Sequence, residues 1–252
     1  MERRQFVKCA ACALAVRSGP VAADSVSHGC FLIGRVNSHH GLNPGPISDI
    51  AQDQTLLESS GDSQLDKLLG RALARASARF EVAPSFSFYR DSDGMNACAT
   101  PDTRTSGTWG SVLFGRQLFD DLLSRYQDNG IAVIAIAAHE FAHILQFKHA
   151  LGPQLEQGEP TVRRSELHAD YVAGWYLGVM KRRDPTISLW SAGDTFRRIG
   201  DYAFNKPSHH GTPSERIAAS QAGFALASRG AAKVGDALNE GLRYMRHVRL
   251  EA

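Results

Sequence analysis

The segment His139-Glu140-Phe141-Ala142-His143 places two imidazoles four residues apart, with a carboxylate directly after the first. Residues four apart share one face of an α-helix, so both imidazoles can bind one metal ion. Glu140 stands where a carboxylate can take a proton from a water molecule that the ion activates. The apolar run 131–138 before it indicates the start of a buried helix. The pattern favours a zinc hydrolase, although the same five residues also occur by chance on surface helices.

A catalytic zinc ion takes three protein ligands and keeps one position open, so a third ligand must come from elsewhere in the chain. Glu166 and Asp170 lie four apart within an apolar stretch. Acids held among apolar residues need a partner or a metal. We therefore predict Glu166 as the third ligand and Asp170 as acceptor for the N–H of a ligating imidazole, which would fix its tautomer. His168 should face elsewhere, in a supporting or packing role.

His149 is the competing third ligand. It follows His143 by six residues, which is the spacing of the metzincin pattern H-E-x-x-H-x-x-G-x-x-H. The glycine of that pattern lets the chain turn back to the metal, and here Gln146 occupies its position. A helix that simply continues would point His149 away from the metal. Glu166 is therefore favoured, and a metzincin-like protease remains an alternative.

Four stretches together resemble the gluzincin group of zinc metallopeptidases, in particular the HtpX/CAAX-protease-like peptidases and related bacterial neutral zinc metallopeptidases. They are residues 139–146 (HEFAHILQ), 164–174 (RSELHADYVAG), 96–99 (NACA) and 210–217 (HGTPSERI). The resemblance covers roughly residues 80–225. It departs from the family after the third stretch, where Thr100-Pro101-Asp102 replaces the usual P-G-G, and in lacking the family's transmembrane helices.

The resemblance implies a zinc-dependent peptidase in which His139, His143 and Glu166 bind Zn²⁺ and Glu140 is the general base. It further implies that Asn96 and Ala97 pair with the backbone of a peptide or protein substrate. His210 and Arg216 correspond to a late histidine and arginine that help to bind substrate or stabilise the oxyanion.

A second class of function is an inactive zinc-binding protein that acts as an interaction partner in the cell envelope. All the groups needed for hydrolysis are present, which favours the enzyme. Charge and composition exclude other classes: the net charge is +2 and no basic stripe is present, so nucleic-acid binding has no support. No apolar run reaches the length of a membrane helix, so we expect no integral membrane segment in the mature chain.

The N-terminus resembles a twin-arginine export signal, with Arg3-Arg4-Gln5-Phe6-Val7-Lys8, an apolar segment at 9–16 and small residues at Val21-Ala22-Ala23. Removing residues 1–23 would take away four basic residues and one acid and change the net charge to −1. We expect export to the periplasm or cell envelope, and a cytoplasmic protein if the signal does not function. Cys9 and Cys12 would leave with the signal, whereas Cys30 and Cys98 would remain and could form a disulfide.

The elements that must position these residues follow an α+β order. We predict a mostly helical zincin-like domain over 63–252, after the signal (1–23) and an irregular leader (24–62). Its predicted helices are 64–80, 117–126, one carrying His139 and His143, one from Thr161 to 183, 187–202, and a final pair that breaks near 229–230. Short strands are predicted near 86–88, 96–100 and 108–114, and residues 150–160 as a loop.

Overall fold

The computed structural model describes residues 56–91 and 94–251. The proposed signal, almost all of the leader, and Cys30 lie outside the described residues, so the Cys30–Cys98 pairing and the domain boundaries stay predictions. The predicted α+β class is confirmed, because the described chain is mostly helical with one small mixed sheet packed on the helix that carries the two histidines.

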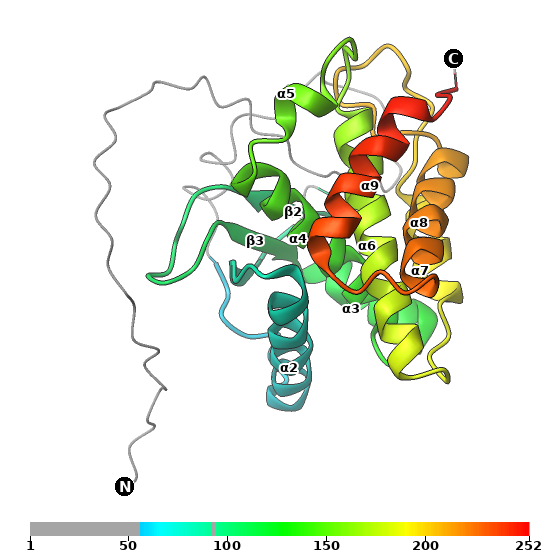
Figure 1. Ribbon diagram of the computed structural model, residues 1–252. Coiled ribbons are helices and arrows are strands. Elements are labelled where there is room, and N and C mark those ends of the chain that lie inside the picture. Colours follow the sequence, from blue (N-terminus) through cyan, green and yellow to red (C-terminus); the bar gives the residue numbers. More distant parts are fainter. Residues whose placement is uncertain (1–55, 92–93, 252) are drawn as a thin grey trace, which may run out of the picture.

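The helices lie close to their predicted positions. They are α2 (Ser63–Phe80), α3 (Arg116–Tyr126), α4 (Ile131–Lys148), α5 (Gly152–Leu155), α6 (Arg163–Arg183), α7 (Trp190–Arg198), α8 (Pro213–Ser228) and α9 (Val234–His247). In Figure 1 the sheet lies to one side of a helical body, and α6 runs through the middle of that body with α9 and α8 beside it.

The sheet contains β1 (Ser85–Tyr89), β2 (Ala97–Thr100) and β3 (Ser111–Gly115) in the order β1-β3-β2. β1 pairs with β3 in parallel, and β2 pairs with β3 antiparallel, with Ala97 opposite Phe114. β2 is therefore an edge strand of the described sheet, and it packs against α4.

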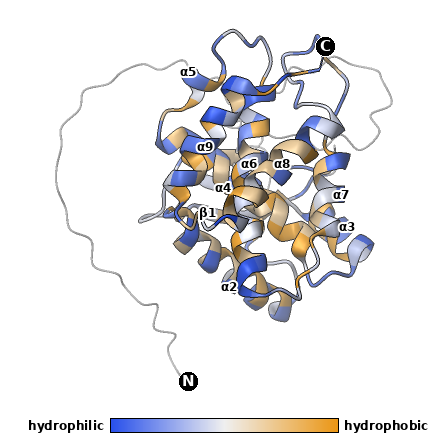
Figure 2. Ribbon diagram, turned by 45° about the vertical axis from the view of Figure 1, so that its right-hand side comes forward, coloured by the Kyte–Doolittle hydropathy of each residue, from blue (hydrophilic) through white to orange (hydrophobic). Residues whose placement is uncertain are grey.

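Helix α4 forms the centre of the core because almost every residue in it is apolar or belongs to the site. Fifteen of its residues are buried, from Ile131 to Gln146 with Ile134 excepted. Just before it, the carboxylate of Asp128 accepts hydrogen bonds from the backbone N–H groups of Ile131 and Ala132. By length and composition α4 is long enough to cross a membrane, but most of it is buried within the protein. Figure 2 shows hydrophobic colour gathered around α4 and α6, while α2 and α9 turn hydrophilic residues outward.

Helix α6 crosses α8 at very close range, at Gly174 of α6 and Gly223 of α8. A Cβ atom at Gly174 would lie 2.0 Å from the carbonyl oxygen of Ser220, and one at Gly223 would lie 1.8 Å from that of Tyr171. Only glycine permits this approach. The crossing fixes α8 against α6 and thereby brings Arg216 next to Asp170.

Two predicted boundaries were wrong for identifiable reasons. Residues 150–160 are not entirely loop, because Gly152–Leu155 form the single turn α5. Pro153 lies in its first turn, where a missing N–H costs no helical hydrogen bond. The helix predicted over 187–202 is shorter, because α7 ends at Arg198. Gly200 then packs against the start of α8, where a Cβ would meet the nitrogen of Pro213 at 2.4 Å.

Candidate metal centre

Helices α4 and α6 bring His139, His143 and Glu166 together in the interior. All three side chains are at most 2% exposed, and their ligand atoms lie within 4.8 Å of one another. The two Nε2 atoms are 3.0 Å apart. His139 Nε2 lies 3.3 Å from Glu166 Oε2, and His143 Nε2 lies 3.3 Å from Glu166 Oε1. The predicted His-His-Glu group is thus assembled, and it can bind a metal ion.

Asp170 lies one helical turn beyond Glu166 and faces the other nitrogen of His139. His139 Nδ1 is 2.8 Å from Asp170 Oδ1. The fully buried Arg216 holds the same carboxylate with two hydrogen bonds, from Nε at 2.7 Å and Nη2 at 2.8 Å. A bidentate guanidinium keeps a carboxylate ionised and fixed in orientation. The carboxylate of Asp170 is thus fixed beside Nδ1 of His139, at 2.8 Å.

Gln146 plays the equivalent part for His143. Its Nε2 donates to the backbone carbonyl of Ser165 at 2.8 Å, and because a carbonyl only accepts, the amide orientation is fixed. Its Oε1 then faces His143 Nδ1 at 2.9 Å and must accept a proton from it. Gln146 Nε2 also lies 3.0 Å from Nδ1 of His168, so that Nδ1 is an acceptor. Burial lowers the pKa of His168 to about 4, which is consistent with a neutral ring.

These partners decide the tautomers of both histidines. Each Nδ1 carries a proton, because each faces an atom that only accepts. In the neutral rings each Nε2 therefore carries a lone pair, and the two lone pairs converge with the carboxylate of Glu166. Neither oxygen of Glu166 receives a hydrogen bond from a described residue. Two imidazole nitrogens and a carboxylate that converge in this way suit a bound cation.

The buried charges also favour a bound cation. Glu140, Glu166 and Asp170 are at most 1% exposed, and Arg216 is the one cationic side chain that an ion pair within the described chain links to them besides the histidines. Burial opposes ionisation of Glu166, but His143, His139 and His210 outweigh it and hold its pKa well below the usual range. With a bound divalent cation, the charges of three carboxylates, one guanidinium and the ion would sum to zero.

Glu140 is buried beside the histidines but makes no bond to them. Neither of its carboxylate oxygens has a hydrogen-bond partner among the described residues. Burial raises its pKa to about 7, against the influence of His139 and His143. A buried carboxylate whose pKa lies near neutral pH, and which makes no structural hydrogen bond, suits a proton carrier better than a structural role.

His209 and His210 lie in the loop before α8, and the carboxylate of Asp201 contacts both of them. Asp201 Oδ1 lies 2.5 Å from His209 Nδ1, and Oδ2 accepts from the backbone N–H of His210 at 2.9 Å. Burial opposes ionisation of Asp201, but its bonds to His210 and His209 hold its pKa below the usual range. His209 Nε2 also faces Arg163, so its two nitrogens are both engaged. Together with His143, His210 is one of the residues that electrostatically lower the pKa of Glu166.

Asn96 and Ala97 lie at the start of the edge strand. The backbone carbonyl of Asn96 accepts from Gly115 of β3 at 2.8 Å. Because backbone groups alternate in direction along a strand, the N–H and C=O of Ala97 point to the opposite, outer edge. The Asn96 side chain is buried, and its Oδ1 has no hydrogen-bond partner among the described residues. Both Ala97 and Ala99 are themselves buried.

His149 does not join the group of possible ligands. It lies at the C-terminal end of α4 and is exposed. The contribution of Gln146 was missed from sequence, where it was considered only as a departure from the metzincin glycine. Its spacing of three residues from His143 on the same helix was the signal that could have found it. The pairing of Arg216 with Asp170 has no local signal, because 46 residues separate them.

No family model, curated protein or solved structure matches this chain. The chemistry of the centre must therefore be judged from its own residues.

Proposed function

We propose that this protein is a zinc-dependent peptidase. The observation that carries the proposal is the convergence of His139 Nε2, His143 Nε2 and Glu166, with Asp170 and Gln146 facing the Nδ1 atoms of the two imidazoles. Two histidines and one carboxylate, with each histidine oriented by a second partner, form a typical ligand set of catalytic zinc.

The spacing of the donor atoms fits such an ion. Ligands about 2.0–2.2 Å from a tetrahedral centre lie roughly 3.3–3.6 Å from one another. Here the two Nε2 atoms are 3.0 Å apart, and each lies 3.3 Å from a different oxygen of Glu166, so the group is close to this size. A bound Zn²⁺ supplies Lewis-acid chemistry, which polarises a carbonyl group and makes water nucleophilic near neutral pH.

The residues of the chain then divide the remaining work. Glu140 accepts the proton of the attacking water and passes it to the leaving amine, because its buried carboxylate has no hydrogen-bond partner among the described residues. His210 donates to the oxyanion that develops on the scissile carbonyl. Two nitrogens of Arg216 donate to Asp170 and the third donates to the carbonyl of Ile199. We therefore assign Arg216 to positioning His139 through Asp170.

The substrate proposed for this centre is an extended peptide or protein segment. The proposed pairing site is the outer edge of β2, toward which the backbone groups of Ala97 and Ala99 point, although both residues are buried here; β2 packs directly against α4. Addition of an extended chain to a sheet edge holds a peptide through its main chain and leaves side-chain choice to neighbouring pockets. Asn96 would contribute through its buried amide rather than its backbone, which β3 already engages.

The proposal extends to the compartment. The twin-arginine-like residues Arg3 and Arg4 support export to the periplasm or cell envelope. Replacing both with lysine should leave the full-length protein in the cytoplasmic fraction, whereas unchanged export would contradict this part of the proposal.

The test of the activity is hydrolysis of an unstructured protein such as casein by the purified zinc-loaded protein. We expect cleavage that a chelator abolishes and that zinc restores. Glu140→Gln should bind zinc with the affinity of the wild type and cleave nothing, because the amide cannot accept the proton. A wild-type protein that binds zinc but cleaves no peptide would instead favour the inactive, zinc-binding interaction protein.

A further inference from the structure

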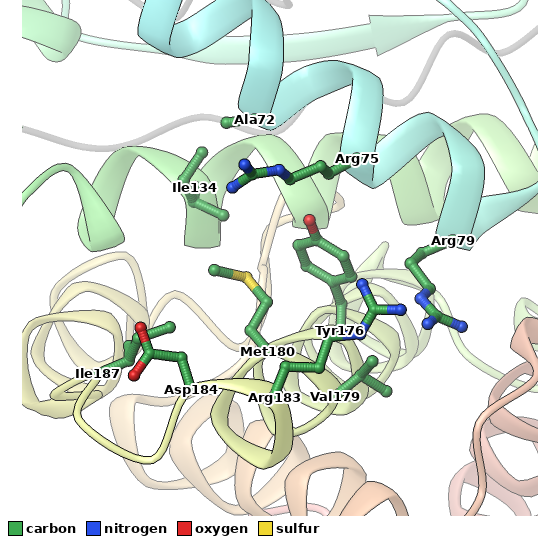
Figure 3. A pocket seen from close by; sticks show the side chains of 10 residues that line it. All are labelled: Ala72, Arg75, Arg79, Ile134, Tyr176, Val179, Met180, Arg183, Asp184 and Ile187. Atoms are coloured by element: carbon green, nitrogen blue, oxygen red, sulfur yellow. The ribbon is translucent and has the colours of Figure 1, made fainter.

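A cavity lies away from the metal centre, between α2, the first turn of α4 and the C-terminal half of α6. Its volume is about 430 Å³, within the range of small-molecule sites. None of the metal-centre residues lines it; from α4 it takes only Ile134. We call it the α2–α6 cavity, lined by Ala72, Arg75, Arg79, Ile134, Tyr176, Val179, Met180, Arg183, Asp184 and Ile187 (Figure 3).

Three guanidinium groups surround the cavity: those of Arg75 and Arg79 from α2 and of Arg183 from α6. None of the three has an ion pair or hydrogen bond with a described residue, although other arginines in the described chain are paired with acids. The three arginines also act together on the buried Tyr176, whose pKa burial raises and these cations lower. Three unneutralised arginines so close together repel one another and form a site for an anion.

The cavity contains one acid, which does not neutralise these cations. The carboxylate of Asp184 accepts hydrogen bonds from the backbone N–H and hydroxyl of Thr186. In Figure 3 it lies beside Ile187, apart from the three guanidinium groups. The net charge of the lining remains positive.

The rest of the lining is apolar. Val179 is buried, and Ile134, Met180 and Ile187 are half-buried between the helices. A simple inorganic anion would leave these side chains facing water. A ligand with an apolar body and an anionic head would satisfy both halves of the cavity, and planar guanidinium groups bind a carboxylate through two parallel hydrogen bonds.

We propose that the α2–α6 cavity binds an amphipathic carboxylate, namely an organic acid with an unbranched apolar body such as a medium-chain fatty acid. The carboxylate contacts Arg75, Arg79 and Arg183, and the aliphatic chain lies on Val179, Met180 and Ile134. This site is independent of the proposed peptidase activity.

Titration calorimetry with octanoate on the full chain tests the proposal. Octanoate should bind, whereas octanol, which lacks the charge, and acetate, which lacks the chain, should bind at least about tenfold more weakly. Binding should weaken as the salt concentration rises, because Arg75 and Arg183 are exposed. Octyl phosphate binding tenfold more tightly than octanoate would overturn the choice of a carboxylate head.

Variants separate this cavity from any other carboxylate site, the metal centre included. The triple variant Arg75→Gln/Arg79→Gln/Arg183→Gln should lose at least about tenfold in octanoate affinity. Lys67→Gln removes a charge from the exposed side of α2 outside the cavity and should leave octanoate binding unchanged. Ala72→Trp should block the cavity without altering its charge. Octanoate binding that survives both the triple variant and Ala72→Trp would refute the proposal.

Discussion

Gln146→Leu is the substitution that tests the assembly of the centre most sharply. Leucine has a similar size but cannot accept the proton of His143 Nδ1, which Gln146 Oε1 holds at 2.9 Å. His143 would then be free to move its proton to Nε2, the atom that faces Glu166. Loss of such a partner typically lowers metal affinity about 10–100-fold. At about 1.4 kcal/mol per tenfold, this corresponds to roughly 1.4–2.8 kcal/mol.

The matched variant is Gln146→Glu, which keeps an acceptor for His143 but loses the donor to Ser165 and His168. Competition with a chromophoric zinc chelator measures the affinity of both variants, and urea unfolding of the metal-free proteins measures their stability. Gln146→Glu should keep near wild-type zinc affinity with a lower free energy of unfolding, whereas Gln146→Leu should lose both. Wild-type zinc affinity in Gln146→Leu would refute the tautomer assignment on which the ligand set rests.

Further predictions concern the helix crossing, the metal and the pH dependence. Gly223→Ala should destabilise the protein by about 1–3 kcal/mol or more in urea unfolding, because its Cβ would meet a backbone carbonyl, whereas Gly70→Ala, with open space around it, should stabilise α2 by about 0.5–1 kcal/mol. Equal effects of the two would contradict the close crossing. Removing zinc with a chelator should lower the Tm in differential scanning calorimetry, because three buried carboxylates then face one guanidinium; an unchanged Tm would argue against a metal in this group. Glu140 must be ionised to accept a proton, and a bound cation lowers the pKa of about 7 that burial gives it. The acid limb of kcat/KM should therefore rise with pH through an apparent pKa at or below about 7, and activity that grows as the pH falls below 6 would exclude Glu140 as the base.

Local sequence patterns predicted most of the helices and the two pairs of candidate site residues. The spacing of His139 and His143, and of Glu166 and Asp170, reflects helical periodicity, which is a property of neighbouring residues. The apolar flanks of both pairs indicated burial, and both helices are indeed buried. Glu166 was preferred over His149 because Gln146 cannot make a sharp turn, and α4 does continue past that residue.

What the sequence did not predict depends on contacts between distant segments. Arg216 was expected to help bind substrate or stabilise the oxyanion, and its pairing with Asp170, which the crossing of α6 and α8 at Gly174 and Gly223 brings about, was not foreseen. The network around Gln146 requires Ser165 and His168 of α6 to face α4. The early end of α7 follows from the packing of Gly200 on α8. Each of these needs the packed helices, and none has a signature within a short window of sequence.

Zinc content of the purified wild-type protein and two variants tests the central claim most directly. We predict about one zinc ion per wild-type chain, with nitrogen and oxygen ligands at about 2.0–2.2 Å in X-ray absorption. Exposed His149 should be replaceable by Gln without loss of zinc, whereas Glu166→Gln should lose most of it. A folded wild-type protein without zinc, or one that loses zinc with His149→Gln and keeps it with Glu166→Gln, would contradict the account.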